Sequence, residues 1–365
     1  MKICMLVPSL GSGGAERTVS YLCDYAVRNG HQVDVVSLTD IKFYDLPENV
    51  PFIPLSNAKI EKNFLKRIIR ASDRCKKFKK YVKENKPDVI FGVLYVALYC
   101  AIISAKNVPL IGSERAAPEM ITSKVKIKIR DYFFKHCDGM IFQTQAVKDY
   151  YKKHNKLDGI VIPNAVGNKI AYEYTEPCQQ REKEIVAVGR LEPQKDYKTM
   201  LDAFEKVYQK HNDFKLIIFG EGKQKQELIQ YANSLSCKDN VFFMGAQKDA
   251  LRRVYSATCY VMTSQNEGMP NALMEAMAVG TPVVSTDCNY GPSELIENNE
   301  NGQLVPVGDA DAVANAILKY IENSEYSQMC ATNAMKLKET NSIDEISRRY
   351  LEYFESVKNN QNKQK

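Results

Sequence analysis

Short apolar runs alternate with longer amphipathic stretches along almost the whole chain, and this rhythm limits the folds that the chain can adopt. Such alternation is typical of parallel sheets whose strands are connected by covering helices. The strands expected in the first half are residues 2–7, 32–37, 89–91, 109–112, 139–142 and 159–162, and those in the second half are 185–188, 215–219, 241–244, 259–262, 282–285 and 303–305. The sequence therefore predicts an α/β protein with two doubly wound domains.

The length of 365 residues also favours two domains, because a single core seldom grows beyond about 300 residues. We expect a first domain over residues 1–167 and a second over 184–342. Residues 168–183 are polar and weakly patterned, so they are expected to be a linker. A helical pattern follows in 343–357, and 358–365 are expected to fray. Two such domains facing each other would leave a cleft at the carboxyl ends of their strands, where ligands of these sheets bind.

The cysteine and histidine content argues against a metal site or a disulfide framework. The ten cysteines include no C-x-x-C pair and the four histidines are dispersed, which favours a reducing compartment. Residues 1–7 run directly into a glycine turn, a pattern that leaves no apolar core for a signal peptide. No apolar run reaches the roughly 18 residues that a membrane span needs. We therefore expect a cytoplasmic protein.

Two carboxylates, Glu267 and Glu275, lie around the expected first turn of a helix over residues 271–279, with Pro270 suited to its first position. The backbone N–H groups there would have no partner within the helix, so with the helix dipole they favour a phosphate. Glu275 is placed to accept from a vicinal diol such as a ribose, and Glu267 from a second polyhydroxyl group. Two unrelated surface glutamates are the alternative. The expected cradle comprises Gly268, Met269, Pro270, Asn271, Ala272 and Leu273.

These residues resemble the GT4 family of retaining glycosyltransferases, which have the GT-B fold of two Rossmann-like domains facing across a cleft. Glu267 and Glu275 match its E-x7-E motif, and residues 267–285 match the longer pattern E-G-x-P-N-A-L-x-E-A-x-A-x-G-x-P-V-V-S. Further matches extend from Val7 to the region of Asp309. The resemblance implies that the last helix, 343–365, crosses back to the first domain, and that Glu267 contacts the transferred sugar.

A second motif, residues 189–195, directly follows the expected strand 185–188. Departure of a nucleoside diphosphate develops negative charge on its β-phosphate, and fixed cations aimed there lower the barrier. Arg190 and Lys195 match the family's paired cations, the arginine able to grip two oxygens and the lysine acting as a point charge. Gly189 precedes them at the end of the strand. Two solvated surface cations are the alternative.

Further glycine turns follow other expected strands and are weaker signals. Glycines in residues 11–17 let the backbone approach a ligand, and a dinucleotide fingerprint is disfavoured because the spacing is not G-x-G-x-x-G. The family resemblance assigns Gly13 and Gly14 to the donor phosphate and the acceptor. It also assigns Gly220 to a turn beside the nucleotide, with a simple tight turn as the alternative, Ala246 and Gln247 to a segment that reads the base, and 290–294 to the sugar pocket.

One position departs from the family pattern. Many members carry a histidine at the end of a first-domain strand near the donor sugar, whereas residues 110–115 read Leu-Ile-Gly-Ser-Glu-Arg. The resemblance therefore assigns the acceptor-side contact to Glu114 or Arg115. A plain pairing of these two side chains on a loop is the alternative.

Positive charge is concentrated in residues 59–86, which hold twelve Lys or Arg and three acidic residues in a chain of net charge +6. Apolar residues recur there at helical spacing, so we expect one or two cationic amphipathic helices. Such a face could rest on an anionic membrane, and a solvated face over an ordinary core stripe is the alternative. Nucleic acid is disfavoured because aromatic residues are few. The expected membrane-facing cations are Lys66, Arg67, Lys76, Lys77, Lys79 and Lys80.

The resemblance implies transfer with retention of configuration from a nucleotide sugar. A UDP-linked hexose or N-acetylhexosamine is the expected donor. The expected acceptor is a polyprenyl-diphosphate-linked oligosaccharide or another glycan at the inner face of the membrane, as in bacterial capsule or lipopolysaccharide assembly. No metal or other cofactor is expected, and Asp309-Ala310-Asp311 is interpreted as a helix cap rather than a D-x-D metal motif. A UDP-sugar epimerase and a non-catalytic nucleotide-sugar-binding protein are the rival functions.

Overall fold

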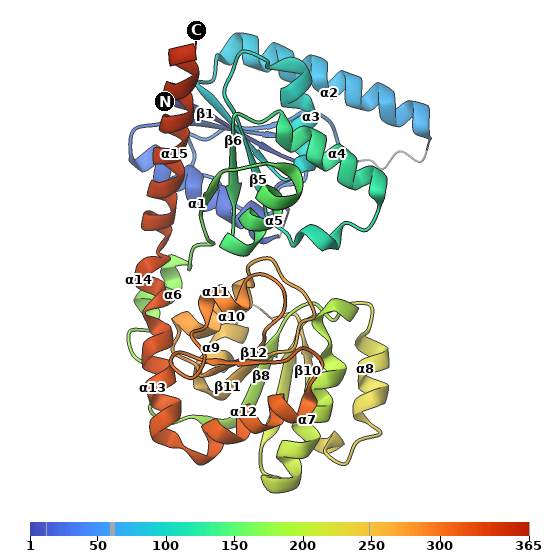
Figure 1. Cartoon of the computed structure of the whole chain (residues 1–365), viewed down its shortest axis with the longest axis vertical. Helices are drawn as coiled ribbons and strands as arrows, with labels where there is room; N and C mark the ends of the chain where they lie inside the picture. Colours follow the sequence, from blue (N-terminus) through green and yellow to red (C-terminus); the bar gives the residue numbers. More distant parts are fainter. Residues whose placement is uncertain (12, 59–62, 248, 365) are drawn as a thin grey trace. The chain divides into compact units, whose positions relative to one another are not determined.

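The computed structural model describes residues 1–11, 13–58, 63–247 and 249–364. The chain forms two compact units (Figure 1). Unit 1 consists of Met1–Ala165 together with Ile343–Lys365, and unit 2 consists of Val166–Ser342. Val166 and Ser342 form a parallel β-bridge, so the chain enters and leaves unit 2 at one place.

Unit 1 contains a parallel sheet whose strands, in the described part of the chain, follow the order β3-β2-β1-β4-β5-β6-β7. The strands consist mainly of buried apolar residues, as expected for a sheet covered on both faces. Their bounds are β1 Lys2–Val7, β2 Gln32–Ser37, β3 Phe52–Pro54, β4 Val89–Val93, β5 Leu110–Glu114, β6 Gly139–Phe142 and β7 Ile160–Val161.

Two groups of helices cover the opposite faces of this sheet. α1 (Gly14–Arg28) packs against α15 (Ile343–Gln364), and α3 (Tyr95–Ser104) packs against both α2 (Phe64–Asn85) and α4 (Lys124–Lys135). Phe91 of β4 contacts the ring of Tyr350 from α15, whereas an added Cβ on the next residue, Gly92, would meet Leu98 of α3. Successive residues of a strand point to opposite faces, so the two groups lie on opposite sides. The other helical segments are η1 Pro118–Met120 and α5 Gln145–Asn155.

The last helix, α15, belongs to the core of unit 1. Its buried residues recur at spacings of three and four and form one apolar stripe. The ring of Phe354 lies 5.2 Å from that of Phe91. The helix continues through Gln364, beyond the point where fraying is expected, and Lys358 forms a 2.9 Å ion pair with Asp88. The stripe consists of Ile343, Ile346, Tyr350, Leu351, Phe354 and Val357.

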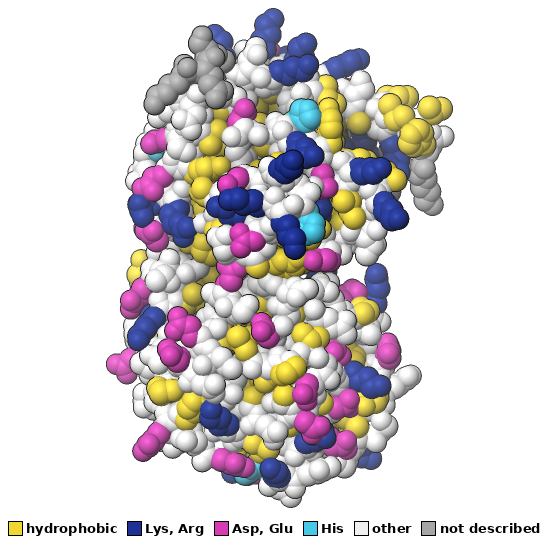
Figure 2. Space-filling view, viewed as in Figure 1, with side chains coloured by type: hydrophobic (Ala, Val, Ile, Leu, Met, Phe, Trp, Pro, Cys, Tyr) yellow, Lys and Arg dark blue, Asp and Glu magenta, His cyan; other side chains and the backbone are white. Residues whose placement is uncertain are grey.

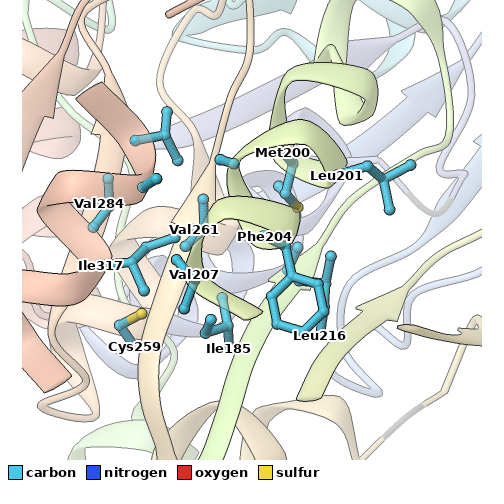
Figure 3. Packing of buried hydrophobic residues seen from close by; sticks show 14 of the residues in the cluster. Ile185, Met200, Leu201, Phe204, Val207, Leu216, Cys259, Val261, Val284 and Ile317 are labelled. Atoms are coloured by element: carbon cyan, nitrogen blue, oxygen red, sulfur yellow. The ribbon is translucent and has the colours of Figure 1, made fainter. Parts of the chain in front are cut away.

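Unit 2 contains a second parallel sheet, whose described strands follow the order β10-β9-β8-β11-β12-β13. Its core is visible in Figure 3, where Ile185, Val261 and Val284 of the strands meet Phe204 and Val207 of α7 (Tyr197–Lys210) and Ile317 of α12 (Ala310–Glu322). The strands are β8 Glu182–Val188, β9 Lys215–Phe219, β10 Val241–Gly245, β11 Ala257–Met262, β12 Val283–Thr286 and β13 Gln303–Val305.

The helices of unit 2 also form two groups. α7 and α12 pack on one face of the sheet, and α9 and α10 contribute to a separate apolar cluster on the other. The bounds are α6 Asn168–Glu173, η2 Pro193–Lys195, α7 Tyr197–Lys210, α8 Lys225–Ala232, η3 Lys238–Asn240, α9 Ala250–Ser256, α10 Asn271–Ala278, α11 Pro292–Leu295, α12 Ala310–Glu322, α13 Ser324–Met335 and α14 Leu337–Thr340.

Each sheet has a point at which the strand order reverses. In unit 2 the chain leaves β8 toward β9 but leaves β11, the other neighbour of β8, toward β12. The connections that follow β8 and β11 therefore diverge at the carboxyl ends of the strands, which is where ligands of doubly wound sheets bind. The same reversal occurs between β1 and β4 in unit 1.

Strand β3 is absent from the sequence prediction. It is only three residues long, ends in Pro54 and lies at the edge of its sheet. Proline cannot donate to a strand ladder and is tolerated at such edges. A short run that contains proline gives no strand signal, so this element becomes recognisable only from its pairing with β2.

Residues 168–183, expected to be a linker, belong to unit 2 instead. The segment begins with α6, and Ile170 is buried in an apolar cluster of that unit. The guanidinium of Arg181 donates to Ala257 O at 3.0 Å and to Gly280 O at 2.7 Å. Its polar composition hides these anchors, because the partners of Ile170 and Arg181 lie far away in the sequence.

We expect Phe354→Ala to lower the free energy of unfolding by about 3–5 kcal/mol, because the ring is fully buried and its removal leaves a cavity. Urea-induced unfolding followed by circular dichroism measures the change. Glu355→Ala, at the exposed next position, is the matched control and should change stability by less than about 0.5 kcal/mol. Equal losses in the two variants would contradict a core role for α15.

Candidate functional site

Two loops meet at the strand reversal of unit 2. η2 follows β8, and residues 263–270 follow β11. Lys195 Nζ lies 2.5 Å from Glu267 Oε1, in an ion pair whose side chains are both largely buried. The Ser264 hydroxyl donates to the same carboxylate oxygen at 2.7 Å. The structure thus joins a carboxylate predicted to contact sugar and a cation predicted to hold phosphate.

Other hydrogen bonds hold these loops together without the lysine amine. The Thr263 hydroxyl lies 3.1 Å from Lys195 O and 2.9 Å from Asp196 O. Gln265 N donates to Gln194 O at 2.8 Å. The backbone of Lys195 is therefore positioned by the strand-end segment of β11, whether or not its ammonium group is engaged with Glu267.

The helix that follows Glu267, α10, begins at the same edge of the sheet. Its first helical residue is Asn271, and Pro270 occupies the N-cap rather than the predicted first helical position. N–H groups of a first turn have no acceptor within their helix, and the dipole places positive charge at that end. Met269, Pro270 and Leu273 are buried, while Gly268, Asn271, Ala272 and Glu275 are partly exposed. Anion binding here would therefore come from the backbone.

Three adjacent strands of unit 2 end in glycine turns that pack on one another. Gly189 N donates to Phe219 O, and Gly220 N donates to Gly245 O, each at 2.9 Å. Gly220 has a φ of +145°, and a Cβ on it would lie 1.8 Å from Gly189 O. Only glycine permits so close an approach.

Arg190 extends from the first of these turns and is exposed. The residues on either side of it are fixed, since Gly189 N bonds to Phe219 O and Leu191 N donates to Glu221 O at 3.0 Å. Arg190 and Lys195 thus leave the same strand, one with its side chain toward solvent and the other paired with Glu267. Lys195 is joined through Glu267 to the loop that leads into α10, and an arginine and a lysine are side chains that suit a diphosphate.

Ala246 and Gln247, predicted to read a base, follow β10 and are exposed. Gln247 Nε2 donates to Met244 O at 3.2 Å. Phe219, Met244 and Gln247 line a cavity of about 210 Å³ at this end of β9 and β10. The cavity combines an aromatic ring, a thioether and polar groups, which a nucleobase can contact.

The predicted sugar-pocket loop, residues 290–294, lies against the same α10 entry. Asn289 and Asn266 form a parallel β-bridge. Gly291 has a φ of +82°, and a Cβ on it would lie 2.2 Å from Gly268 O. The structure therefore brings this loop next to the Glu267 segment.

Gly13 and Gly14 lie in unit 1, after β1. Gly13 is the N-cap of α1 with extended backbone, and Gly14 is the first helical residue. The glycines stand at the carboxyl end of a central strand, beside the reversal between β1 and β4.

Glu114, at the end of β5, is buried within unit 1. Its carboxylate accepts from the Tyr151 hydroxyl at 2.7 Å and from Arg115 N at 2.9 Å. Burial raises the pKa of this carboxyl group, and the Tyr151 hydrogen bond and the charge of Arg130 oppose the rise.

Arg115 has a different set of partners. Its guanidinium donates to Thr18 Oγ1 and Asn164 Oδ1 at 2.7 Å each and to the Tyr350 hydroxyl at 2.5 Å. It therefore ties α1, α15 and the segment after β7 together. The side chains of Glu114 and Arg115 are held by different groups rather than by each other.

The predicted basic segment forms one helix, α2, whose start is capped by the Asn63 side chain. Lys66, Arg67, Lys76, Lys77, Lys79 and Lys80 are all exposed. Residues 59–62 of that segment lie outside the described residues. Among the helices described, none is long and apolar enough to cross a membrane.

In the part of the chain that the structure describes, no three His, Cys, Asp or Glu side chains gather as metal ligands would. The helix-cap interpretation of residues 309–311 is confirmed. The Asp309 carboxylate accepts from Ala312 N at 2.9 Å, and Asp311 pairs with Lys206 at 2.8 Å.

Ser264 and Thr263 contact the site, and the sequence reasoning missed both. The available signal was the pair of small polar residues directly after the buried strand β11, the same position that singles out Gly189 and Arg190 after β8. Cys288 is also close to Glu267, but burial and that carboxylate raise the pKa of its thiol to about 12. The thiol is therefore neutral near pH 7 and is not an activated nucleophile.

Two family models match the chain. Glycosyltransferase Family 4 matches residues 12–167, and Glycosyl transferases group 1 matches residues 175–337. An α-1,4-N-acetyl-D-galactosaminyltransferase of Campylobacter jejuni, named for a diphospho-undecaprenol-linked glycan, is 26% identical over 98% of this chain and 99% of its own. An uncharacterised glycosyltransferase of Methanocaldococcus jannaschii is 31% identical, over 61% of each chain.

The fold also has solved counterparts. HepE of Anabaena, solved in complex with UDP-glucose, superposes with a TM-score of 0.77 at 20% identity and covers 98% of this chain and 100% of its own. This likeness shows that the two parallel-sheet units have the GT-B architecture predicted from the sequence.

We expect Gly220→Ala to disrupt the ends of β8 and β9, because its Cβ would collide with the backbone oxygen of Gly189. The loss of stability should exceed about 3 kcal/mol, as for other severe backbone strain. Gly30→Ala is the matched control, since Gly30 also has positive φ, +79°, but has nothing within 4 Å of the added atom. Thermal unfolding of the two variants measures the difference, and similar melting temperatures would contradict the tight contact.

Proposed function

Since this chain belongs to glycosyltransferase family 4, we propose that it transfers a hexose or N-acetylhexosamine from UDP to a lipid-linked glycan. The proposed setting is the assembly of a bacterial surface polysaccharide, a capsule or lipopolysaccharide. The paired Lys195 and Glu267 at the strand reversal of unit 2 carry this proposal. A sugar bound by the carboxylate would have its diphosphate within reach of the lysine.

The proposed reaction needs charge stabilisation at the leaving group. When the bond between the sugar C1 and the diphosphate oxygen breaks, negative charge grows on the diphosphate. Arg190, Lys195 and the first-turn N–H groups of α10 are the donors available to that charge. The Lys195 ammonium is held by Glu267 and the backbone on both sides of Arg190 is hydrogen-bonded, which limits the reorganisation needed as the charge develops.

Retention follows, in this proposal, from attack on the face that the diphosphate leaves. The acceptor oxygen forms its bond to C1 while the C1–O bond to the diphosphate breaks, and the acceptor proton passes to a diphosphate oxygen. In this proposal Glu267 binds the sugar rather than attacking it, and hydrogen bonds from Lys195 and Ser264 to its Oε1 hold the carboxylate in place. The reaction is proposed to run without a metal, so a chelator should leave the rate unchanged.

UDP is the proposed nucleotide because HepE, which shares the fold, was solved with UDP-glucose. The cavity lined by Phe219, Met244 and Gln247 supports a base site at the ends of β9 and β10. Glu275, one turn into α10, is the proposed partner of the ribose hydroxyls. The C. jejuni relative supports an N-acetylhexosamine and a polyprenyl-diphosphate-linked acceptor.

We also propose an acceptor-side role for Glu114 and Arg115. Both lie at the carboxyl end of β5, the edge at which doubly wound sheets bind ligands. Their hydrogen bonds to Tyr151 and to Thr18, Asn164 and Tyr350 indicate that they act mainly by fixing the loop after β5.

A new UDP-sugar formed without acceptor would instead favour an epimerase.

Lys195→Ala should reduce transfer by roughly 100- to 1,000-fold, the loss typical of one missing charge stabiliser. Mass spectrometry of a nucleotide-sugar screen with membrane extract as acceptor measures product formation and identifies donor, sugar and acceptor class together. Lys210→Ala is the matched control, because Lys210 is an exposed lysine at the opposite end of α7 from Lys195. Unchanged turnover in Lys195→Ala would refute the proposed site, and binding of UDP-sugar without any turnover would favour a binding protein.

The enzyme is proposed to work at the cytoplasmic face of the membrane, held by charge attraction to anionic lipid. Replacing Lys66, Arg67, Lys76, Lys77, Lys79 and Lys80 by Gln should weaken binding to anionic vesicles, because each cation near such a surface contributes about 1 kcal/mol. Vesicle sedimentation measures binding, and hydrolysis of a soluble donor should be spared.

A control for this variant must lose the same charge from another surface. Lys198, Lys206, Lys210, Lys215, Lys223 and Lys238 of unit 2 are exposed and can be replaced by Gln together. Equal vesicle binding by the two sextuple variants would show that the six cations of α2 have no special membrane role.

A further inference from the structure

The first six residues of α2 are all exposed, although four of them are large and apolar. The exposed fractions of Phe64, Leu65, Ile68 and Ile69 lie between 51% and 70%. A helix on the surface of a globular protein normally turns such residues toward the core. Figure 2 shows a cluster of hydrophobic side chains where Figure 1 places the start of α2. Apolar residues fill four of these six exposed positions. Such a patch indicates a surface that is covered by an apolar partner.

The outward face of α2 continues from this apolar start into a row of lysines. Leu65, Ile69 and Ser72 are followed at the same helical spacing by Lys76, Lys79, Lys80 and Lys83, all exposed. The core-facing side, by contrast, carries the buried Phe78 and Tyr81. An apolar end followed by cations on one face matches a bilayer, whose acyl region lies beneath its anionic headgroups.

A second helix of unit 1, α4, also exposes apolar residues on its outward face. Val125, Ile129 and Tyr132 of α4 lie at spacings of four and three on its outward face, with exposed fractions between 43% and 67%. The opposite side of the helix is the buried one, with Arg130 and Phe134. The exposed Lys124, Lys126, Lys128 and Lys135 border the apolar stripe. Nothing in the sequence analysis pointed to this helix.

Helix α3 connects the two surfaces. It packs against both α2 and α4, and it exposes Val96 and Ile103. One cavity of about 560 Å³ is lined by Ile103 of α3, Tyr132 of α4 and Lys106. The exposed Ile103 of α3 and Tyr132 of α4 are therefore neighbours.

We propose that these three helices form a bilayer-docking face, in which apolar side chains insert among acyl chains while the surrounding lysines bind anionic headgroups. This docking face consists of Phe64, Leu65, Ile68, Ile69, Val96, Ile103, Val125, Ile129 and Tyr132. It goes beyond the charge attraction proposed for α2, because insertion persists at salt concentrations that screen surface charge. It does not depend on the reaction that the enzyme catalyses.

The occupant is a lipid surface rather than a second copy of the chain. α2 carries nine Lys or Arg against two acidic residues, and α4 carries five against one. Two copies meeting through this face would bring like charges together, which is destabilising. An anionic bilayer supplies both the apolar interior and the opposite charge.

The docking face also has a defined position in unit 1. α2 ends just before β4 begins, α4 ends just before β6 begins, and α3 starts directly after β4. All three helices therefore start near the carboxyl edge of the sheet. That edge carries Gly13 and the loop after β5 that Glu114 and Arg115 fix, so a membrane on this face would present a lipid-linked acceptor near the loop proposed to serve the acceptor side.

The chain contains no tryptophan, so one introduced tryptophan reports its own surroundings. We expect the fluorescence of Leu65→Trp and of Ile129→Trp to shift to shorter wavelength on vesicles of phosphatidylglycerol and phosphatidylcholine, and to be quenched by brominated acyl chains. Both changes should persist at about 1 M salt, where the Debye length is roughly 3 Å. Met329→Trp, at an exposed position of α13 in unit 2, is the matched control and should show neither change.

A second variant tests the energetic contribution. Replacing Phe64, Leu65, Ile68 and Ile69 by Ser should lower vesicle partitioning by roughly 100-fold, because most of the apolar area that would leave water is removed. Donor hydrolysis by the same variant shows whether the fold and the proposed site are intact, so a failed reaction and failed docking are distinguishable.

Three outcomes would overturn the proposal. The first is that vesicles leave the fluorescence emission of both Leu65→Trp and Ile129→Trp unchanged. The second is quenching equal to that of Met329→Trp. The third is a blue-shifted emission without vesicles in a protein that sediments as a dimer, which would assign the face to a second copy of the chain.

Discussion

The reversal of strand order between β8 and β11 is the constraint on which the candidate site depends. Where the connections of two neighbouring parallel strands leave in opposite directions, the loops do not cover the carboxyl ends of those strands. A crevice for a ligand is left there. Thr263 and Gln265 then fix the two diverging loops to each other by hydrogen bonds to the 194–196 backbone. Between these loops the Lys195 ammonium and the Glu267 carboxylate meet at 2.5 Å. The chemistry of the site is therefore a consequence of sheet topology.

The main elements of the fold could be predicted because buried parallel strands are continuous apolar runs. β1, β2, β6, β9 and β13 have the bounds expected from the sequence. β3 could not be predicted, since an edge strand with proline depends on its neighbour rather than on its own pattern. Residues 168–183 look like a linker because the contacts of Ile170 and Arg181 involve partners distant in sequence.

The sequence singles out the charged residues of the candidate site but not the groups that hold them in place. Glu267, Arg190 and Lys195 stand out because their charges follow strands in recognisable motifs. Ser264 contributes a single hydroxyl, and its contact with Glu267 depends on the turn between them, which no periodicity encodes. Arg115 could be singled out, yet its bonds to Thr18, Asn164 and Tyr350 join segments far apart in the chain. The apolar stripe of α4 was missed because its spacing equals that of an ordinary core-facing stripe, and only burial reveals which way it faces.

The position of α15 has a consequence for how the protein comes into being. The first 165 residues lack Tyr350, Leu351 and Phe354, which fill the core around β1 and β4, until the last part of the chain has been made. Unit 2 is encoded without interruption from residue 166 to residue 342. During translation all residues of unit 2 are therefore synthesised before unit 1 is complete. The apolar surface of unit 1 that α15 covers stays exposed until the end of the chain has been made.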